Sequence, residues 1–191
     1  MSLRRTALLG TMAWLGVLPV CPAGDLPADS LYQLRAELTT GKGPVGFDVY
    51  QGHPTVISMF YGSCPAYCPM LITATQVYES GLDEPSRARL RVLLVSFDAA
   101  RDTPQRLTEL ARLHRTDPDR WIFASANEPD ARRIAALLGF HYRRLPDGSF
   151  DHSQIITLVD SHGRVVASTT KLIGDAGFQA KLQASTASDQ P

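Results

Sequence analysis

The chain has few cysteines and no excess charge: among 191 residues there are three cysteines, 19 basic residues and 19 acidic residues. Nucleic-acid-binding domains carry a concentrated positive charge, so we expect no nucleic-acid partner. Neither glycine-rich phosphate-binding pattern, Gly-x-Gly-x-x-Gly or the lysine-containing P-loop, occurs. Internal repeats and low-complexity blocks are also absent from the sequence. With 44% hydrophobic residues, a chain of this length is predicted to form one domain with one core.

A long membrane-spanning run is missing too. The apolar stretch at residues 7–20 is too short to cross a bilayer comfortably. It follows Arg4 and Arg5 and precedes a small-residue region that ends at Ala23, an order typical of a secretory signal peptide. Residues 1–23 are therefore predicted to be a signal peptide and the mature protein to be periplasmic. Cleavage would leave 19 − 2 = 17 basic and 19 acidic residues, a formal charge of 17 − 19 = −2. Two alternatives stay open: a lipidated Cys21, and an uncleaved membrane anchor.

Export would leave only Cys64 and Cys68, in a compartment where they can pair with each other. They lie in the run YGSCPAYCP at residues 61–69, directly after an apolar segment at 55–61 that is expected to be a buried strand. A separation of four residues predicts that both sulfurs share one helix face. Because a helix N-terminus favours thiolate over thiol, we expect a two-thiolate site rather than an inert pair of core cysteines.

The rest of the chain is predicted to alternate strands and helices. Strands are expected at residues 55–61, 91–97 and 121–124, helices at 67–80, 104–115 and 129–138, and two closing strands at 155–160 and 164–168. A helix at residues 174–183 and a flexible tail at 185–191 follow. Before the core, residues 31–39 and 45–50 flank a Gly-Lys-Gly-Pro turn and are expected to pair as a hairpin.

This order predicts an α/β fold of the thioredoxin-like type, because a cysteine pair follows the first core strand and the core ends in a β-hairpin and a helix. We expect a central mixed sheet flanked by helices, with an N-terminal β-hairpin extension. Residues 24–44 would form the lead and the start of that hairpin, and residues 45–184 the thioredoxin-like domain.

Two chemistries compete for a dithiol at this place, namely disulfide exchange and binding of a soft metal. Thiol-disulfide exchangers of this fold usually have two residues between the cysteines and a proline opening the strand that faces them. Here three residues intervene, residues 149–156 contain no proline, and His152 stands at that place. Two thiolates and an imidazole suit Cu(I), and also Cu(II) if a further ligand joins. Zinc is the rival metal, but a structural zinc site generally needs four protein ligands, and only three good candidates are found.

Three motifs make the chain resemble the Sco/SenC family of periplasmic and mitochondrial copper proteins that serve cytochrome c oxidase assembly. They are FYGSCPAYCP at residues 60–69, VSFDAARDTP at 95–104, and FDHS at 150–153. The resemblance implies that Cys64, Cys68 and His152 bind copper in a thioredoxin-like domain.

The same resemblance implies a metallochaperone, most simply not an enzyme, whose partner is a copper acceptor protein such as a cytochrome c oxidase subunit. Cys64 and Cys68 are also candidates for a redox-active dithiol that reduces the acceptor, with a thiol reductant protein as a second partner. The alternative is a thiol-disulfide oxidoreductase or thiol peroxidase with no metal role. A third reading is a structural domain in which the cysteine pair is a fixed staple.

The sequence departs from the family pattern at Ala99, where proline is usual, and at residues 51–54, before the first core strand. In the central motif, Thr103 and Pro104 are predicted to cap and open a helix, with Asp102 favouring its positive end. Asp98 ends a strand, so it is expected to shape the electrostatic potential near the copper.

Other candidate donors are given structural roles. Met59 and Met70 are placed in the core, and the remaining histidines are predicted to be surface or loop residues: His53, His114, His141 and His162. The pairs Arg132-Arg133 and Arg143-Arg144 are predicted to be solvated, with a docking surface for an acidic partner as the alternative.

Overall fold

The computed structural model describes residues 26–64 and 67–187, so the predicted signal peptide, Cys21 and residues 188–191 lie outside the described residues. The strands are β1 (Leu38–Thr40), β2 (Gly43–Val45), β3 (Thr55–Phe60), β4 (Arg91–Ser96), β5 (Trp121–Ala126), β6 (Tyr142–Arg144), β7 (Phe150–His152), β8 (Ile156–Val159) and β9 (Val165–Thr169). Seven of them form one mixed sheet in the order β2-β1-β5-β4-β3-β8-β9, and β6 pairs with β7 in a separate ribbon.

The centre of the sheet consists of β3, β4 and β5, which run parallel to one another. Every residue of β3 is buried, and β4 is buried after its first position. Near-continuous apolar sequence of this kind is typical of a parallel strand covered on both faces. β8 joins β3 in the antiparallel direction and β9 closes that edge. The predicted central mixed sheet is therefore confirmed.

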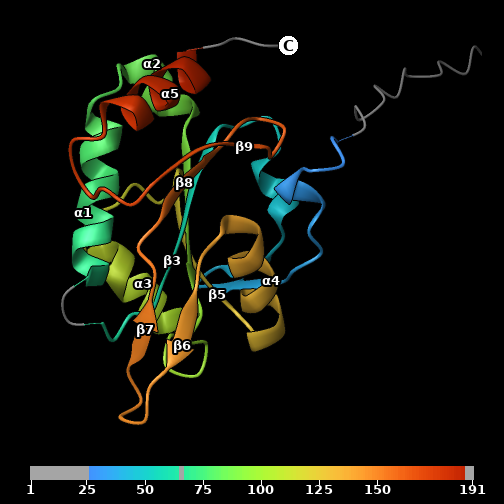
Figure 1. The fold of residues 1–191 in the computed structure, drawn as a ribbon, viewed down its shortest axis with the longest axis vertical. Coiled ribbons are helices and arrows are strands. Elements are labelled where there is room, and N and C mark those ends of the chain that lie inside the picture. The colour runs from blue at the N-terminus through green and yellow to red at the C-terminus, as the bar shows by residue number, and fades with distance from the viewer. Residues whose placement is uncertain (1–25, 65–66, 188–191) are drawn as a thin grey trace, which may run out of the picture.

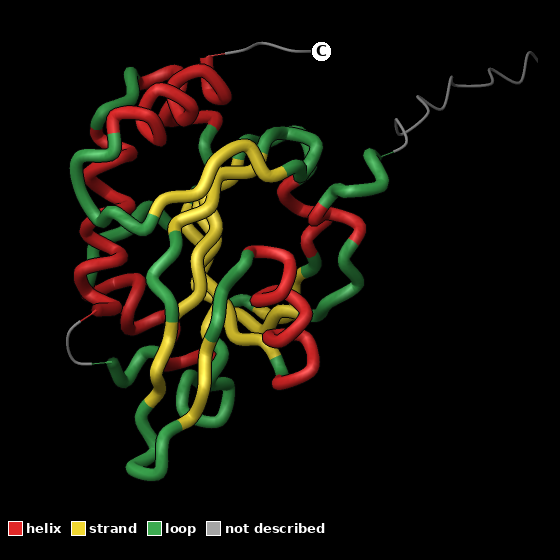
Figure 2. Tube along the Cα trace, viewed as in Figure 1, coloured by secondary structure: helices red, strands yellow, loops and turns green. Residues whose placement is uncertain are grey.

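The helices are α1 (Tyr67–Ser80), α2 (Glu84–Arg89), α3 (Pro104–Leu113), α4 (Glu128–Leu138) and α5 (Ala176–Ala187), with short 3-10 turns η1 (Leu31–Gln33) and η2 (Phe47–Tyr50). α1 and α3 lie on one side of the sheet and α4 on the other (Figure 1, and by secondary structure in Figure 2). α2 and α5 pack together at one end of the molecule, and the β6–β7 ribbon projects at the opposite end (Figure 1). No helix within residues 26–64 and 67–187 is long and apolar enough to cross a bilayer.

The capping signals in the sequence are confirmed. The Thr103 side chain accepts a hydrogen bond from the Arg106 amide at 3.3 Å, and Pro104 is the first residue of α3. α4 ends at Leu138 and is followed by the capping residue Gly139, whose φ of 65° lies in the left-handed region that glycine adopts without strain.

The predicted N-terminal hairpin exists, but its predicted bounds were wrong. β1 and β2 pair over only three residues each, and the flanking residues form η1 and η2 instead of longer strands. Phe47 and Tyr50 of η2 are fully buried, so the chain turns inward directly after β2. The hairpin also extends the main sheet, because β1 pairs antiparallel with β5.

Three further differences concern the residues after α1. The short helix α2 and the β6–β7 ribbon were not predicted. The flexible tail predicted at residues 185–191 is wrong for residues 185–187, which belong to α5. The last turn of α5 is ordered because Thr186 is buried and its carbonyl accepts a hydrogen bond from Arg89 Nε at 2.7 Å.

Candidate metal centre

The two cysteines follow β3, but only one belongs to a helix. The chain turns after β3, with the Cys64 amide donating to the Tyr61 carbonyl at 3.2 Å, and α1 begins only at Tyr67. Cys68 therefore lies in the first turn of α1, whereas Cys64 precedes the helix, and the prediction that both sulfurs share one helix face is wrong. Both residues are thiols and both are buried, with 6% and 5% of their surface exposed.

Tyr61 connects the two cysteines. The Cys68 thiol donates to the Tyr61 carbonyl at 2.9 Å. The Tyr61 hydroxyl is a hydrogen-bond partner of the Cys64 thiol and lies within reach of the backbone of Phe150 in β7. The Cys64 thiol is in turn a hydrogen-bond partner of Cys68. The two sulfurs therefore lie side by side, and Tyr61, the residue directly after β3, contacts both of them.

The protonation of Cys68 differs from the sequence prediction. Burial raises the pKa of the Cys68 thiol well above its ordinary value, and the neighbouring Cys64 and the Asp102 carboxylate act in the same direction. Loss of hydration outweighs the helix N-terminus here, so the metal-free protein holds Cys68 as a thiol. A metal ion that binds Cys68 must displace this proton.

His152 reaches the same region from β7. Its Nδ1 lies 2.7 Å from the carbonyl oxygen of Ser153. A carbonyl only accepts hydrogen bonds, so Nδ1 is the protonated nitrogen; in the neutral imidazole Nε2 then has the lone pair with which the ring binds metals. The rings of Tyr61, Phe97 and Phe140 surround the imidazole at centroid distances of 5.5, 5.9 and 6.0 Å. The orientation of the imidazole is therefore set by its surroundings.

Cys68 and His152 line one small cavity of about 10 Å³. The other residues around it are Met59, Leu71, Ser153 and Gln154. A cavity of that size holds about one water-sized particle. In the described part of the chain, no group of three or more His, Cys, Asp or Glu side chains is arranged to hold a metal ion. The structure thus pairs Cys64 with Cys68 and Cys68 with His152, and the three-ligand set stays a prediction.

Asp102 has a larger role than the predicted one at the positive end of α3. It is 1% exposed and accepts hydrogen bonds from the Gly62 amide at 2.7 Å and from the Ser96 hydroxyl. A Cβ atom on Gly62 would collide with the Asp102 carboxylate, so the close approach requires glycine there. Asp102 therefore ties the turn before Cys64 to the end of β4.

Asp98 pairs with Arg101 at 2.5 Å, and the same guanidinium donates to the carbonyl of Gly148, in the turn between β6 and β7, at 2.6 Å. This link fastens the His152 ribbon to the loop after β4. The expected effect of Asp98 on the potential near copper stays a prediction. The sequence predicted no role for Arg101 or Tyr61, although Asp98 and Arg101 carry opposite charges in one short loop.

The predictions for the methionines and the other histidines have mixed outcomes. Met59 is buried, as predicted, but Met70 is 51% exposed. The Met70 prediction is wrong because two residues after the buried Cys68 a helix presents its opposite side. The other histidines are exposed or half-buried, in agreement with the prediction: His53, His114, His141 and His162.

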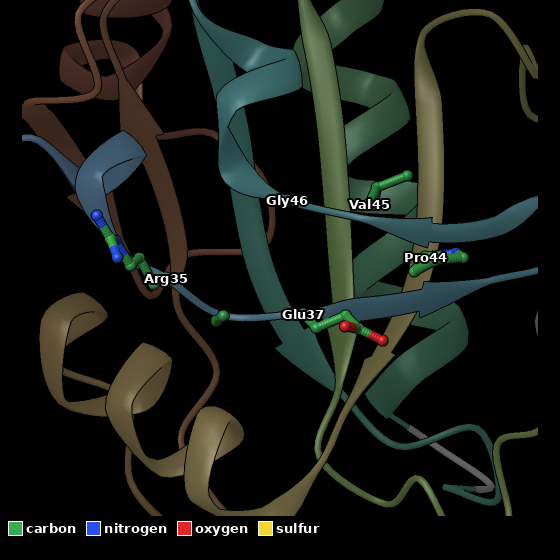
Figure 3. Close-up of a pocket in the computed structure, with 6 residues that line it drawn as sticks. Arg35, Glu37, Pro44, Val45 and Gly46 are labelled. Carbon is green, nitrogen blue, oxygen red and sulfur yellow. The ribbon is translucent and has the colours of Figure 1, made fainter.

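A larger pocket lies away from the cysteines. It has a volume of about 450 Å³ and is lined by residues before β1 and within β2, including Arg35, Glu37 and Pro44 (Figure 3). In the sheet, β1, β5 and β4 separate β2 from β3, which leads to the cysteines. No cysteine or histidine lines this pocket, so it is not part of the candidate metal centre.

Comparison with known proteins agrees with this geometry. A family model described as SCO1/SenC matches residues 30–187. The chain belongs to this family. The resemblance predicted from the three motifs is therefore confirmed.

Relatives of this SCO1/SenC protein are named for copper. A protein of Stutzerimonas stutzeri, whose name describes it as copper-binding, is 25% identical over 124 residues, which covers 63% of this chain and 59% of that protein. The match thus spans less than two thirds of the relative's length.

Among solved structures, ScoI of Bradyrhizobium japonicum with copper bound has a TM-score of 0.66 and 22% identity, over 78% of this chain and 96% of that chain. Yeast Sco1 with copper bound has a TM-score of 0.67 and 18% identity, over 82% of this chain and 88% of that chain. At these identities the likeness shows the fold, and the predicted thioredoxin-like α/β fold is confirmed.

Proposed function

We propose that this SCO1/SenC protein is an exported copper chaperone that holds one copper ion through Cys64, Cys68 and His152 and passes it to an acceptor protein. The observation that carries the proposal is the cavity shared by Cys68 and His152, together with the hydrogen bond between the Cys64 and Cys68 thiols. Two sulfurs and one imidazole nitrogen form a soft donor set, which suits Cu(I) and, with a further ligand, Cu(II).

The described geometry supports capture of the ion by a short local movement. Cys64 lies in a turn before α1, and His152 lies on the separate β6–β7 ribbon, so neither of these two donors belongs to a helix or to the central sheet. Binding then replaces the Cys68 proton by the metal. A three-donor site leaves a coordination position for an incoming ligand of the acceptor, which allows stepwise transfer.

The family and the sequence support a proposal for the acceptor and for the compartment. We propose the copper site of cytochrome c oxidase as the acceptor, and the periplasm as the compartment because of the signal-like residues 1–23. In an oxidising compartment the acceptor cysteines must be reduced before they bind metal, so reduction by the Cys64-Cys68 dithiol is the accompanying activity we propose.

The test is copper loading of the reduced full chain under anaerobic conditions, followed by metal analysis and absorption of the Cu(II) form. We expect one equivalent of copper in the wild type and loss of stable binding in Cys64→Ser and Cys68→Ser. His152→Ala should bind more weakly and have shifted thiolate charge-transfer bands.

His141→Ala is the matched control for that experiment. His141 is exposed and lines a surface hollow of about 430 Å³ together with His152, but it does not line the cavity at Cys68. Its variant should load copper like the wild type. Unchanged copper binding and absorption in all four variants would refute the site.

The second candidate function is thiol-disulfide exchange without metal. It is favoured by one observation, the contact between the Cys64 and Cys68 thiols, from which a disulfide can form. This function predicts no stoichiometric copper, rapid cycling of the disulfide, and a mild effect of His152→Ala.

A further inference from the structure

A second pocket lies beside the candidate metal centre, between the loop after β4, the start of α4 and the β6–β7 ribbon. Its volume is about 310 Å³. It is lined by Phe97, Asp98, Ala99, Ala100, Ala126, Glu128, Arg132, Tyr142, Arg144 and Phe150. The lining of the pocket thus combines aromatic rings, small alanines and charged side chains. Phe97, Tyr142 and Phe150 form its aromatic wall, and the charged lining residues form its rim.

The aromatic wall is shared with the metal centre. Phe97 stacks on Tyr142 with ring centroids 4.5 Å apart and contacts Phe150 at 5.2 Å. Phe97 also lies 5.9 Å from the His152 ring, and Phe150 lies 5.1 Å from the Tyr61 ring. A single layer of rings therefore joins the pocket to the residues around the cysteines.

The rim carries one excess positive charge when Arg101, the ion-pair partner of Asp98 outside the lining, is counted with it. Asp98 pairs with Arg101 at 2.5 Å, and Glu128 pairs with Arg132 at 2.9 Å. Within residues 26–64 and 67–187, Arg144 makes no ion pair, and its guanidinium lies over the Phe150 ring, 5.8 Å from the centroid. The charges of the two ion pairs cancel, so the Arg144 guanidinium remains as an uncompensated positive charge beside the aromatic wall.

This combination selects the chemistry of an occupant. A cationic group would meet the guanidinium groups of Arg132 and Arg144, whereas a carboxylate can accept charge-assisted hydrogen bonds from them. The ring wall can cover an apolar side chain next to that carboxylate. The volume is at the lower end for a small-molecule site, and the lining residues Ala99, Ala100, Arg132 and Arg144 are exposed, so a side chain presented by a larger surface fits better than a free ligand.

We infer that this pocket docks an acidic segment of a protein partner, whose carboxylate pairs with Arg144 and whose neighbouring apolar side chain packs on Phe97, Tyr142 and Phe150. The identity of that partner as the copper acceptor rests on the proposed function. The docking itself does not, because it requires no copper and neither cysteine.

The chain supplies a matched control next to Arg144. Side chains alternate along a strand, so in β6 Tyr142 and Arg144 share one face and Arg143 faces the other way. Arg143 is exposed like Arg144 and pairs with Asp151 at 3.2 Å, opposite it in the ribbon. Removal of either arginine changes the net charge equally, but only Arg144 lines the pocket.

The experiment is an NMR titration of the ¹⁵N-labelled, metal-free full chain with the acidic peptide GDEFEDG and its neutral counterpart GNQFQNG. We expect the acidic peptide to shift amides of the pocket residues and to bind at least about tenfold more tightly than the neutral one, because charge-assisted hydrogen bonds are involved. Arg144→Ala should weaken binding by about tenfold. Arg143→Ala should stay within about twofold of the wild type.

Two further variants separate the possible causes of failure. Ala100→Trp adds bulk at an exposed position of the pocket without changing charge, and it should also weaken binding. Cys68→Ser removes a candidate copper ligand that does not line this pocket, and it should bind the peptide normally, so loss of the copper function leaves this test intact. Equal binding of both peptides, equal losses in Arg143→Ala and Arg144→Ala, or no binding at all would each overturn the inference.

Discussion

Tyr61 is the residue that contacts all three candidate copper ligands. Its carbonyl accepts from Cys68, its hydroxyl is a hydrogen-bond partner of Cys64, and its ring meets the His152 ring edge-on at 5.5 Å. The carbonyl contact would survive any substitution, whereas the hydroxyl contact depends on tyrosine. The hydroxyl is therefore the part of the site that a conservative variant can remove.

Tyr61→Phe is expected to lower the free energy of unfolding by about 1 kcal/mol, since one hydrogen bond is lost while the ring packing is kept. We also expect a shift of the thiolate charge-transfer absorption in the copper-loaded protein, because the Cys64 sulfur loses its hydroxyl partner. Urea denaturation and absorption spectroscopy measure the two effects.

Tyr78→Phe is the control for this prediction. The Tyr78 hydroxyl donates to the carbonyl of Lys171 at 2.8 Å, between α1 and the segment after β9. The control should lose a similar amount of stability and keep the wild-type absorption. An identical spectrum in Tyr61→Phe would show that the hydroxyl has no influence on the sulfur.

At the residue scale, the sequence supplied the candidate donors as a prediction, but it did not supply the protonation state of Cys68. The spacing of Cys64 and Cys68 and the position of His152 could be seen in the motifs. The protonated state of Cys68 could not, because it results from burial by residues distant in the sequence. Met70 was expected on a different helix face from Cys68 but still in the core, whereas that face is exposed to solvent.

Among the secondary-structure elements, the β6–β7 ribbon decides where His152 lies. It was missed because Tyr142-Arg143-Arg144 is short and polar and carries no alternating apolar pattern. The ribbon is stabilised instead by ring packing around Phe97 and by Arg101. In contrast, β3, β4, β5, α3 and α4 were predicted well, because continuous apolar runs and caps are local signals.

Arg101→Ala is expected to loosen the ribbon, since the variant loses the hydrogen bond to Gly148, the ion pair to Asp98 and the guanidinium over Phe150. Hydrogen exchange of the amides at residues 142–152 should become faster, with the central sheet unchanged. Arg106→Ala removes an exposed pair to Glu109 at 3.7 Å and should leave the exchange unchanged. Equal exchange in both variants would contradict the role of Arg101.

Asp102→Asn tests the hydrogen bonds by which Asp102 connects the turn after β3 to the end of β4. The amide can keep only part of the pairing with the Gly62 amide and the Ser96 hydroxyl, so the free energy of unfolding should fall by about 2 kcal/mol. Asp83→Asn, at the exposed N-cap of α2, should change it by less than about 0.5 kcal/mol, because asparagine caps as well as aspartate. Urea denaturation measures both variants. Similar losses of unfolding free energy would show that these hydrogen bonds of Asp102 do not stabilise the fold.

At the scale of the whole molecule, the two ends of β3 differ in their surroundings. The carboxyl end leads to the cysteines. Near the amino end, the Tyr32 hydroxyl lies 2.9 Å from the His53 carbonyl oxygen and 3.2 Å from both the Thr55 hydroxyl and the Asp160 carbonyl oxygen. Tyr50 is buried beside it, 1% exposed, and its hydroxyl has no hydrogen-bond partner among the described residues. This buried tyrosine cluster at the amino end of β3 stabilises the fold and lies at the other end of the strand from the candidate metal centre.

The buried tyrosines at the amino end of β3, Tyr32 and Tyr50, are expected to make the free energy of unfolding fall at alkaline pH. Burial raises the pKa values of Tyr32 and Tyr50, with the Asp160 charge adding to the effect on Tyr32 and Tyr32 itself adding to that on Tyr50. Because the folded pKa values exceed those of the unfolded chain, the stabilisation is complete below about pH 10 and is lost as the pH rises further. Each tyrosine contributes a slope of up to about 1.4 kcal/mol per pH unit in that range.

Tyr50→Phe should therefore flatten the alkaline loss of stability and cost nothing at about pH 7, where its hydroxyl contributes no hydrogen bond. The measurement is urea denaturation of the reduced, metal-free chain and its variant at about pH 7, 9 and 10.5. Other tyrosines and the cysteines titrate in both proteins, so their effects cancel in the difference. Parallel curves for the two proteins would mean that Tyr50 ionises equally in the folded and unfolded chain, and that its burial does not govern the alkaline stability of this fold.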